Sequence, residues 1–122
     1  MKNVIAFILI ITIYSAVQTV SAQDVQTVKL EQTEGEFNLK GITLSAGIYQ
    51  FEVMNNGVDH EVGFVVAPKG MTEQKNHIKE AYLTETIKNG KSAKSGEVKL
   101  APGEYVYFCP MNPTPEYIIT VK

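Results

Sequence analysis

Short segments in which apolar and polar residues alternate follow one another along most of this chain of 122 residues. Alternate side chains of a strand point to opposite faces, so each segment predicts a half-buried β-strand. The pattern predicts strands at Val25–Glu31, Glu36–Lys40, Ile48–Met54, His60–Ala67, Val98–Leu100, Glu104–Cys109 and Tyr117–Val121. Short strands separated by turn residues are typical of an all-β, antiparallel sandwich.

Two of the predicted turns share one pattern, Leu-x-x-Gly-x-Tyr, at residues 44–49 and 100–105. In the second, Pro102 and Gly103 suit a type II turn, because proline fixes one φ and glycine accepts a positive one. The pattern indicates one tight connection used twice. It does not recur with the period that a solenoid requires.

The alternation stops between Pro68 and Gly96. Residues 73–88 are rich in helix formers, Ile78 and Tyr82 have helical spacing, and Gly90 follows where a helix would end. We expect one or two helical turns packed at an end or edge of the sheet. No composition shift marks a boundary in residues 23–122, which are predicted to form a single domain.

The first 22 residues have the features of an export signal. Lys2 is their one charged residue, an apolar run covers residues 4–17, and Val20-Ser21-Ala22 fits a cleavage site. The alternative is an uncleaved membrane anchor, which needs roughly 20 continuous apolar residues. The run is shorter, so we predict cleavage after Ala22, no stable membrane insertion afterwards, and a protein that is periplasmic or secreted.

The charged residues exclude several functions. The remaining 100 residues carry all 13 acidic side chains and 10 lysines, and the chain has no arginine. Nucleic-acid binding is not expected, because phosphate contacts need concentrated positive charge. An enzyme is not expected either, since the sequence has no Gly-rich phosphate loop, no histidine pair with zinc-site spacing, and no second histidine suited to a Ser-His-Asp set.

Cys109 is the only cysteine of the chain. In an oxidising compartment cysteines normally occur in bonded pairs. An unpaired one is a metal ligand, a reactive thiol, half of an intermolecular bridge or an inert buried residue. Neither neighbour of Cys109 is a cation, which disfavours the reactive thiol.

Two stretches of the chain resemble the cupredoxins, small exported proteins that bind one copper ion. Residues 46–60, from Ala46-Gly47-Ile48-Tyr49 to Asp59-His60, are similar to the strand that leads to the family's first histidine ligand. Residues 100–110, ending in Tyr107-Phe108-Cys109-Pro110, are similar to the strand that delivers its cysteine ligand. The resemblance implies a Greek-key β-sandwich with a short helical insertion, with His60 as an imidazole ligand and Cys109 as the thiolate.

The loop after Cys109 departs from the family pattern. In the shortest family loops a histidine stands three residues after the cysteine and a methionine six residues after it. Here these positions hold Asn112 and Pro115. The substitutes are Met111, a soft thioether, and then Glu116 and His77. Each has a plainer interpretation, packing for Met111 and a solvated surface position for Glu116 and His77.

Two functions follow from these residues. In the first, the protein binds one copper ion through an incomplete ligand set, for electron transfer or copper handling, with a redox protein or a copper donor as partner. In the second, the fold has lost its metal and serves as an interaction or structural module. Three prolines, Pro110, Pro113 and Pro115, stiffen the loop and suit both functions.

Overall fold

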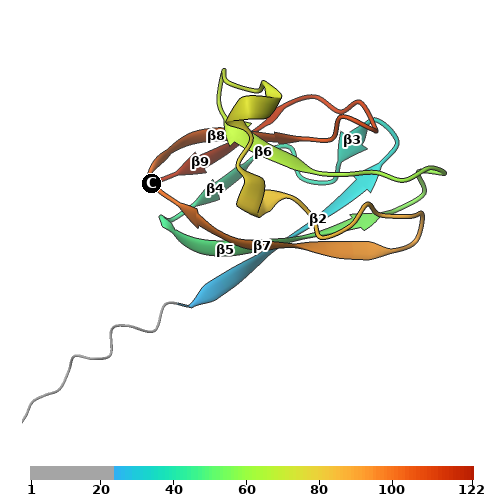
Figure 1. The fold of residues 1–122 in the computed structure, drawn as a ribbon, viewed down its shortest axis with the longest axis horizontal. Helices are drawn as coiled ribbons and strands as arrows, with labels where there is room; N and C mark the ends of the chain where they lie inside the picture. The colour runs from blue at the N-terminus through green and yellow to red at the C-terminus, as the bar shows by residue number, and fades with distance from the viewer. Residues whose placement is uncertain (1–23) are drawn as a thin grey trace, which may run out of the picture.

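Two four-stranded sheets pack face to face in the computed structural model of the chain, which describes residues 24–122 (Figure 1). The first sheet has the order β3-β2-β5-β7 and the second the order β4-β9-β8-β6. The strands are β2 (Val25–Thr33), β3 (Glu36–Phe37), β4 (Ile42–Leu44), β5 (Gly47–Asn55), β6 (Val65–Pro68), β7 (Ser92–Leu100), β8 (Gly103–Phe108) and β9 (Tyr117–Val121). The predicted signal peptide lies outside the described residues.

The predicted β-sandwich is confirmed, but its pairings are not all antiparallel. β2 pairs with β5 in parallel, and so does β4 with β9. The cause is that β3 and β4 lie between β2 and β5 in the sequence, and β4 crosses to the second sheet. β5 therefore runs beside β2 in the same direction as β2, and no hairpin connects the two strands.

The alternation of the sequence sets the inward faces. On β5, Tyr49, Phe51 and Val53 are all buried, while the residues between them are partly exposed. Aromatic rings fill the middle of the core, where Phe37 meets the rings of Phe64 and Tyr107 edge to face at 5.9 and 5.2 Å. Such pairs stabilise a core beyond the apolar area they bury.

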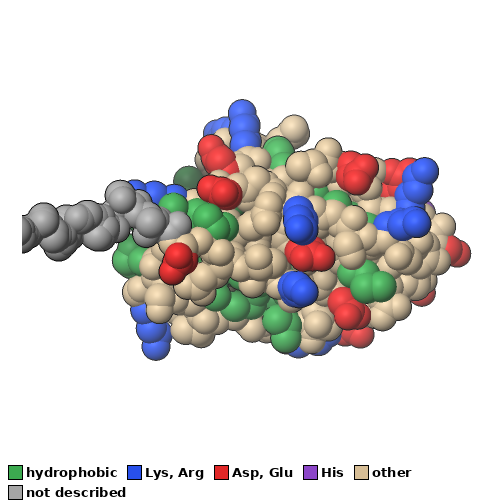
Figure 2. Space-filling model, turned by 90° about the horizontal axis from the view of Figure 1, so that it is seen from below, with side chains coloured by type: hydrophobic (Ala, Val, Ile, Leu, Met, Phe, Trp, Pro, Cys, Tyr) green, Lys and Arg blue, Asp and Glu red, His purple; other side chains and the backbone are tan. Residues whose placement is uncertain are grey.

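The outer face of the first sheet is polar. Figure 2 shows positive and negative side chains interspersed over this surface. One row is explained by the strand register, which places Lys29, Glu52 and Lys94 side by side on β2, β5 and β7. A face with mixed charges stays in water, as expected for a sheet that buries only one side.

The repeated Leu-x-x-Gly-x-Tyr motif forms the same structure twice. The hydroxyl of Tyr49 donates a hydrogen bond to the carbonyl of Ser45 at 2.6 Å. The hydroxyl of Tyr105 donates to the carbonyl of Ala101 at 2.7 Å. Gly103 has a φ of 153°, which glycine adopts without the strain that a side chain would bring. Each tyrosine thus closes the tight turn at the start of its own strand.

The strand expected at His60–Ala67 begins later than predicted. The observed strand, β6, starts at Val65. Val62 instead pairs with Ile87 through two backbone hydrogen bonds of 3.0 and 2.9 Å. The apolar phase was right, since Val62, Phe64 and Val66 are buried, but His60 is exposed. Pairing with the last part of the insertion, rather than with β8, ends the regular strand before it reaches His60.

The insertion contains two single turns of 3-10 helix, η3 (Gln74–Asn76) and η4 (Lys79–Ala81). The amide of Ile78 donates to the carbonyl of Val66 at 2.8 Å, which attaches the insertion to the free edge of β6. The expected helical turns at a sheet edge are therefore confirmed. Within residues 24–122, no helix has the length and apolar character needed to span a membrane.

Candidate functional site

Cys109 follows β8 directly and is buried, with 1% of its surface exposed. Its sulfur accepts two backbone hydrogen bonds, from the N–H of Gly63 at 3.3 Å and from the N–H of Asn112 at 3.2 Å. Its own N–H donates to the hydroxyl of Thr114 at 3.0 Å. The sulfur is thus held in place by donors from two different loops, and such donors bind a negatively charged acceptor most strongly.

Asn112 occupies the position of the family's second histidine, and it is buried. Its side-chain amide donates to Gln32 Oε1 at 3.0 Å and to the carbonyl of Thr33 at 2.9 Å. Its side-chain oxygen accepts the N–H of Gly35 at 2.8 Å. Since the amide donates both of its hydrogens and the oxygen accepts a bond, this side chain connects the Cys109 loop to the turn between β2 and β3.

Gln32 was not predicted to belong to the site. It is fully buried on the inward face of β2, and its Nε2 donates to the carbonyl of Gly63 at 2.6 Å. The sequence does contain a signal, because Val28, Leu30 and Gln32 share one phase of the strand alternation. A polar residue in the inward phase of a strand must find partners inside the protein.

Met111 lies against Gly63 from the other direction. Its side chain is partly in solvent, and its sulfur lies 3.4 Å from the point where a Cβ on Gly63 would stand. Gly63 therefore donates its N–H to the sulfur of Cys109, and the sulfur of Met111 lies on the side of its Cα that carries no side chain. The two soft donors of the loop are gathered around one residue.

His60 is exposed, and its Nδ1 lies 2.9 Å from the carbonyl oxygen of Glu61. It lines an open, polar hollow with Asp59, Glu61, Lys88 and Asn89. The hydroxyl of Thr86 donates to the Glu61 carboxylate. Among the described residues, no hydrogen bond connects the His60 ring with the Cys109 loop.

His77 is engaged at both ring nitrogens. Nε2 lies 3.0 Å from the carbonyl oxygen of Thr72, so this nitrogen carries the proton, and Nδ1 accepts the hydroxyl of Tyr82 at 2.8 Å. The ring packs edge to face on Phe108, with 6.0 Å between centroids. This histidine holds the insertion against β8. Glu116, the last candidate, is exposed.

These positions do not fit a copper centre with two imidazoles and a thiolate in one plane. Asn112 fills the second imidazole position with an amide already bonded to β2 and Gly35, and both nitrogens of His77 are in use. In residues 24–122, no three His, Cys, Asp or Glu side chains are grouped as a metal site would require. The donors that do share a neighbour are the sulfurs of Cys109 and Met111.

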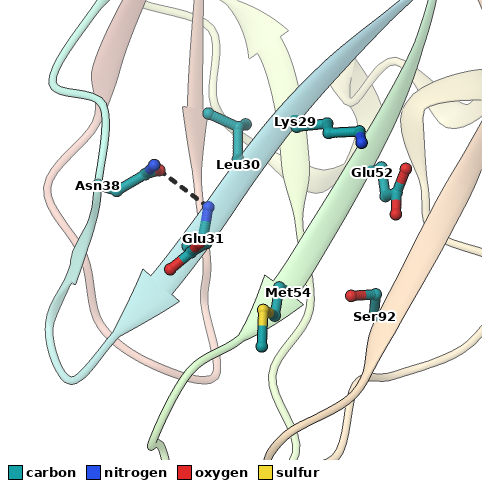
Figure 3. A pocket seen from close by; sticks show the side chains of 7 residues that line it. All are labelled: Lys29, Leu30, Glu31, Asn38, Glu52, Met54 and Ser92. Carbon is teal, nitrogen blue, oxygen red and sulfur yellow. Dashed lines mark hydrogen bonds between the residues drawn. The ribbon is translucent and has the colours of Figure 1, made fainter.

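A separate hollow lies on the outer face of the first sheet (Figure 3). Across it, Lys29 and Glu52 face each other on neighbouring strands, and the amide of Glu31 donates to the side chain of Asn38 at 2.8 Å. Leu30, Met54 and Ser92 complete its lining. It includes none of the predicted site residues, so we place the candidate site at Cys109.

The comparisons with known proteins agree with this fold. The family model described as a cupredoxin-like domain matches residues 3–121. Auracyanin A, a blue copper protein from Chloroflexus aurantiacus, superposes with a TM-score of 0.66 at 14% identity, over 81% of this chain and 100% of its own.

Two further solved structures are similar. Auracyanin from Roseiflexus castenholzii gives a TM-score of 0.61 at 16% identity, over 80% of this chain and 97% of its own. An azurin from Methylomonas sp. strain J gives 0.60 at 13% identity, over 80% and 98%. No curated protein sequence matches the chain significantly. The family model spans nearly the whole sequence, and this protein belongs to the cupredoxin-like family.

Proposed function

We propose that this protein binds a single Cu(I) ion through the sulfurs of Cys109 and Met111 and handles copper outside the cytoplasm. The observation that supports this most is the arrangement around Gly63. Its N–H donates to the buried sulfur of Cys109, and the sulfur of Met111 lies beside it on the side where a Cβ would stand. Thiolate and thioether are the soft donors that Cu(I) prefers.

The side chains of the loop favour Cu(I) binding over a copper centre that cycles between two oxidation states. Copper electron transfer is fast where both states accept nearly the same ligand geometry, which the family achieves with two imidazoles. Here an asparagine replaces one of them, and its amide is bonded elsewhere. A sulfur-based set favours the reduced ion, and the partner would then be a copper donor or acceptor protein. His60, three residues before Gly63, is the remaining candidate for a third ligand.

The test is a titration of the purified mature protein with Cu(I) in competition with a chromogenic Cu(I) chelator. We expect one equivalent to bind. Cys109→Ser should abolish binding, and Met111→Leu should weaken it about tenfold or more, because one of two soft donors is lost. Met71→Leu is the matched control, since Met71 is another exposed methionine, outside the loop. Absence of binding, or binding that Cys109→Ser leaves unchanged, contradicts the proposal.

The second candidate is a metal-free interaction module, and the observation that favours it is the fixed side chain of Asn112. A loop anchored to β2 and to the turn after it by three side-chain hydrogen bonds is held in place without an ion. Pro110, Pro113 and Pro115 are exposed on it and form a stiff surface. This alternative predicts that neither Cu(I) nor Cu(II) binds and that Cys109→Ala leaves partner capture unchanged.

Export is part of the proposal and has its own test. The apolar run and the Val20-Ser21-Ala22 pattern support cleavage after Ala22. Protein expressed from the full sequence in a bacterial host should be recovered from the periplasm or medium with Gln23 at its N-terminus. An intact Met1 in the membrane fraction would show an uncleaved anchor instead.

A further inference from the structure

We propose that Gln32 is a positioning residue for the sulfur of Cys109. Its side chain completes a hydrogen-bonded ring that begins and ends at this sulfur. Gly63 donates its N–H to the sulfur, and its carbonyl accepts Gln32 Nε2. Gln32 Oε1 accepts the side chain of Asn112, whose backbone N–H donates to the sulfur.

The ring matters because of the residues that supply the N–H donors. Gly63 has no side chain, so two freely rotating backbone bonds connect its N–H to its carbonyl. The 2.6 Å bond from Gln32 fixes that carbonyl and thereby limits the directions in which the N–H can point. The bond from Asn112 to Gln32 restricts the second donor in the same way. One glutamine is therefore bonded to both residues whose N–H groups reach the sulfur, without touching the sulfur itself. It adds to the bond from the Ile87 N–H to the Val62 carbonyl, which holds the peptide unit of the Gly63 N–H.

Burial makes the arrangement costly to disturb. Gln32 has no exposed surface, and Asn112 and Cys109 are 2% and 1% exposed. If the glutamine amide is removed, the carbonyl of Gly63 and the amide of Asn112 lose partners where water does not replace them readily. These groups then gain by turning toward solvent, and this movement opens a path to the sulfur. This effect on the sulfur requires no bound ion.

The test compares Gln32→Met with Gln50→Met in the mature, metal-free protein. Methionine keeps the length of glutamine and removes its amide. Gln50 is the matched control, because its Nε2 also donates to a backbone carbonyl, that of Ser95 at 2.9 Å, on a strand away from Cys109. Alkylation of Cys109 by iodoacetamide under native conditions should be about tenfold faster in Gln32→Met. In Gln50→Met it should stay within about twofold of the wild-type rate.

A variant that is only less stable should be alkylated at Cys109 more slowly than Gln32→Met. Val98→Ala destabilises the core of β7 without removing a hydrogen bond, and urea can bring it to the same free energy of unfolding as Gln32→Met. If alkylation is equally fast in both, or if Gln32→Met reacts like wild type, the inference is wrong.

Wild-type protein supplies a second measurement that does not depend on a variant folding. The N–H groups of Gly63 and Asn112 should exchange with solvent as slowly as those of central β5, although both lie in loops. Exchange at the rate of an exposed loop would overturn the inference. Because no metal is present in these experiments, their outcome is separate from that of the copper titration.

Discussion

The Cys109 loop (residues 109–116) and the insertion (residues 69–91) are both irregular segments, but they are held differently. The loop buries Cys109 and Asn112, and their polar atoms bond to β2, to the β2–β3 turn and to Gly63. The insertion is mostly exposed. Backbone hydrogen bonds attach it to both sheets, from Ile78 to Val66 and from Thr84 to Lys94, and His77 packs it against β8. Anchoring through buried polar side chains of its own distinguishes the candidate site from an ordinary connection.

Asn112→Leu should have the largest effect, because it removes three side-chain hydrogen bonds at a buried position. The N–H of the half-buried Gly35 and the fully buried Oε1 of Gln32 lose their partner. We expect a loss of about 3 kcal/mol in the free energy of unfolding, measured by urea denaturation. A loss below about 1 kcal/mol would mean that the loop is not anchored through this side chain.

The strand that carries the loop gives a pH-dependent effect. Burial raises the pKa of Tyr107 from 10 to about 12, and its hydroxyl donates to the carbonyl of Leu39 at 2.6 Å. The folded state binds this proton more tightly than the unfolded state, so the stabilisation is complete below pH 10 and is lost as the pH rises toward 12. About 2 kcal/mol should disappear over this interval.

Tyr107→Phe is the check on this assignment. It should cost about 1 kcal/mol at neutral pH, because the hydrogen bond from the buried side chain to the carbonyl of Leu39 is lost. It should also flatten the stability curve between pH 10 and pH 12. Unfolding at a series of pH values measures both. An unchanged alkaline slope in the variant would assign the titration to other groups.

His77→Phe tests the insertion. The ring contact with Phe108 can be kept, but the bonds to Thr72 and Tyr82 are lost. We expect about 1 kcal/mol of destabilisation, with faster hydrogen exchange confined to residues 72–82. If the Cys109 loop also exchanges faster, the two regions are coupled, and they are not held independently of each other.

Gly63→Ala should have the smallest effect. The new methyl group would stand 3.4 Å from the sulfur of Met111, which is exposed and flexible enough to move. The N–H that bonds to Cys109 is retained. We expect a change in stability below about 0.5 kcal/mol and a shifted methyl resonance for Met111 alone. A shifted Asn112 amide would show that both sulfurs respond together.

Local pattern was sufficient for most of the fold. β9 was predicted with its observed bounds, and β5 and β8 within one residue at each end, because these strands alternate regularly and have turn residues beside them. β4 was missed, since Ile42–Leu44 is only three residues long and its partner β9 is far away in the sequence. Long-range pairing of this kind leaves little local signal.

The candidate site was less accessible to sequence reasoning. The lone Cys109 pointed to its loop, but the groups that bond to its sulfur or orient those bonds come from residues 32, 63 and 112, which only the packed sandwich brings together. His60 shared an apolar phase with Val62 and Phe64, yet the regular strand ends before it. The ligand roles of His60, Cys109, Met111, Glu116 and His77 remain predictions.

Because Gln32 belongs to one sheet and Cys109 follows a strand of the other, the thiol is enclosed only after both halves of the sandwich have closed. Before folding, the same sulfur is as accessible as any residue of an extended polypeptide. Closure of the sandwich therefore shields this thiol from reagents in solution, oxidants included.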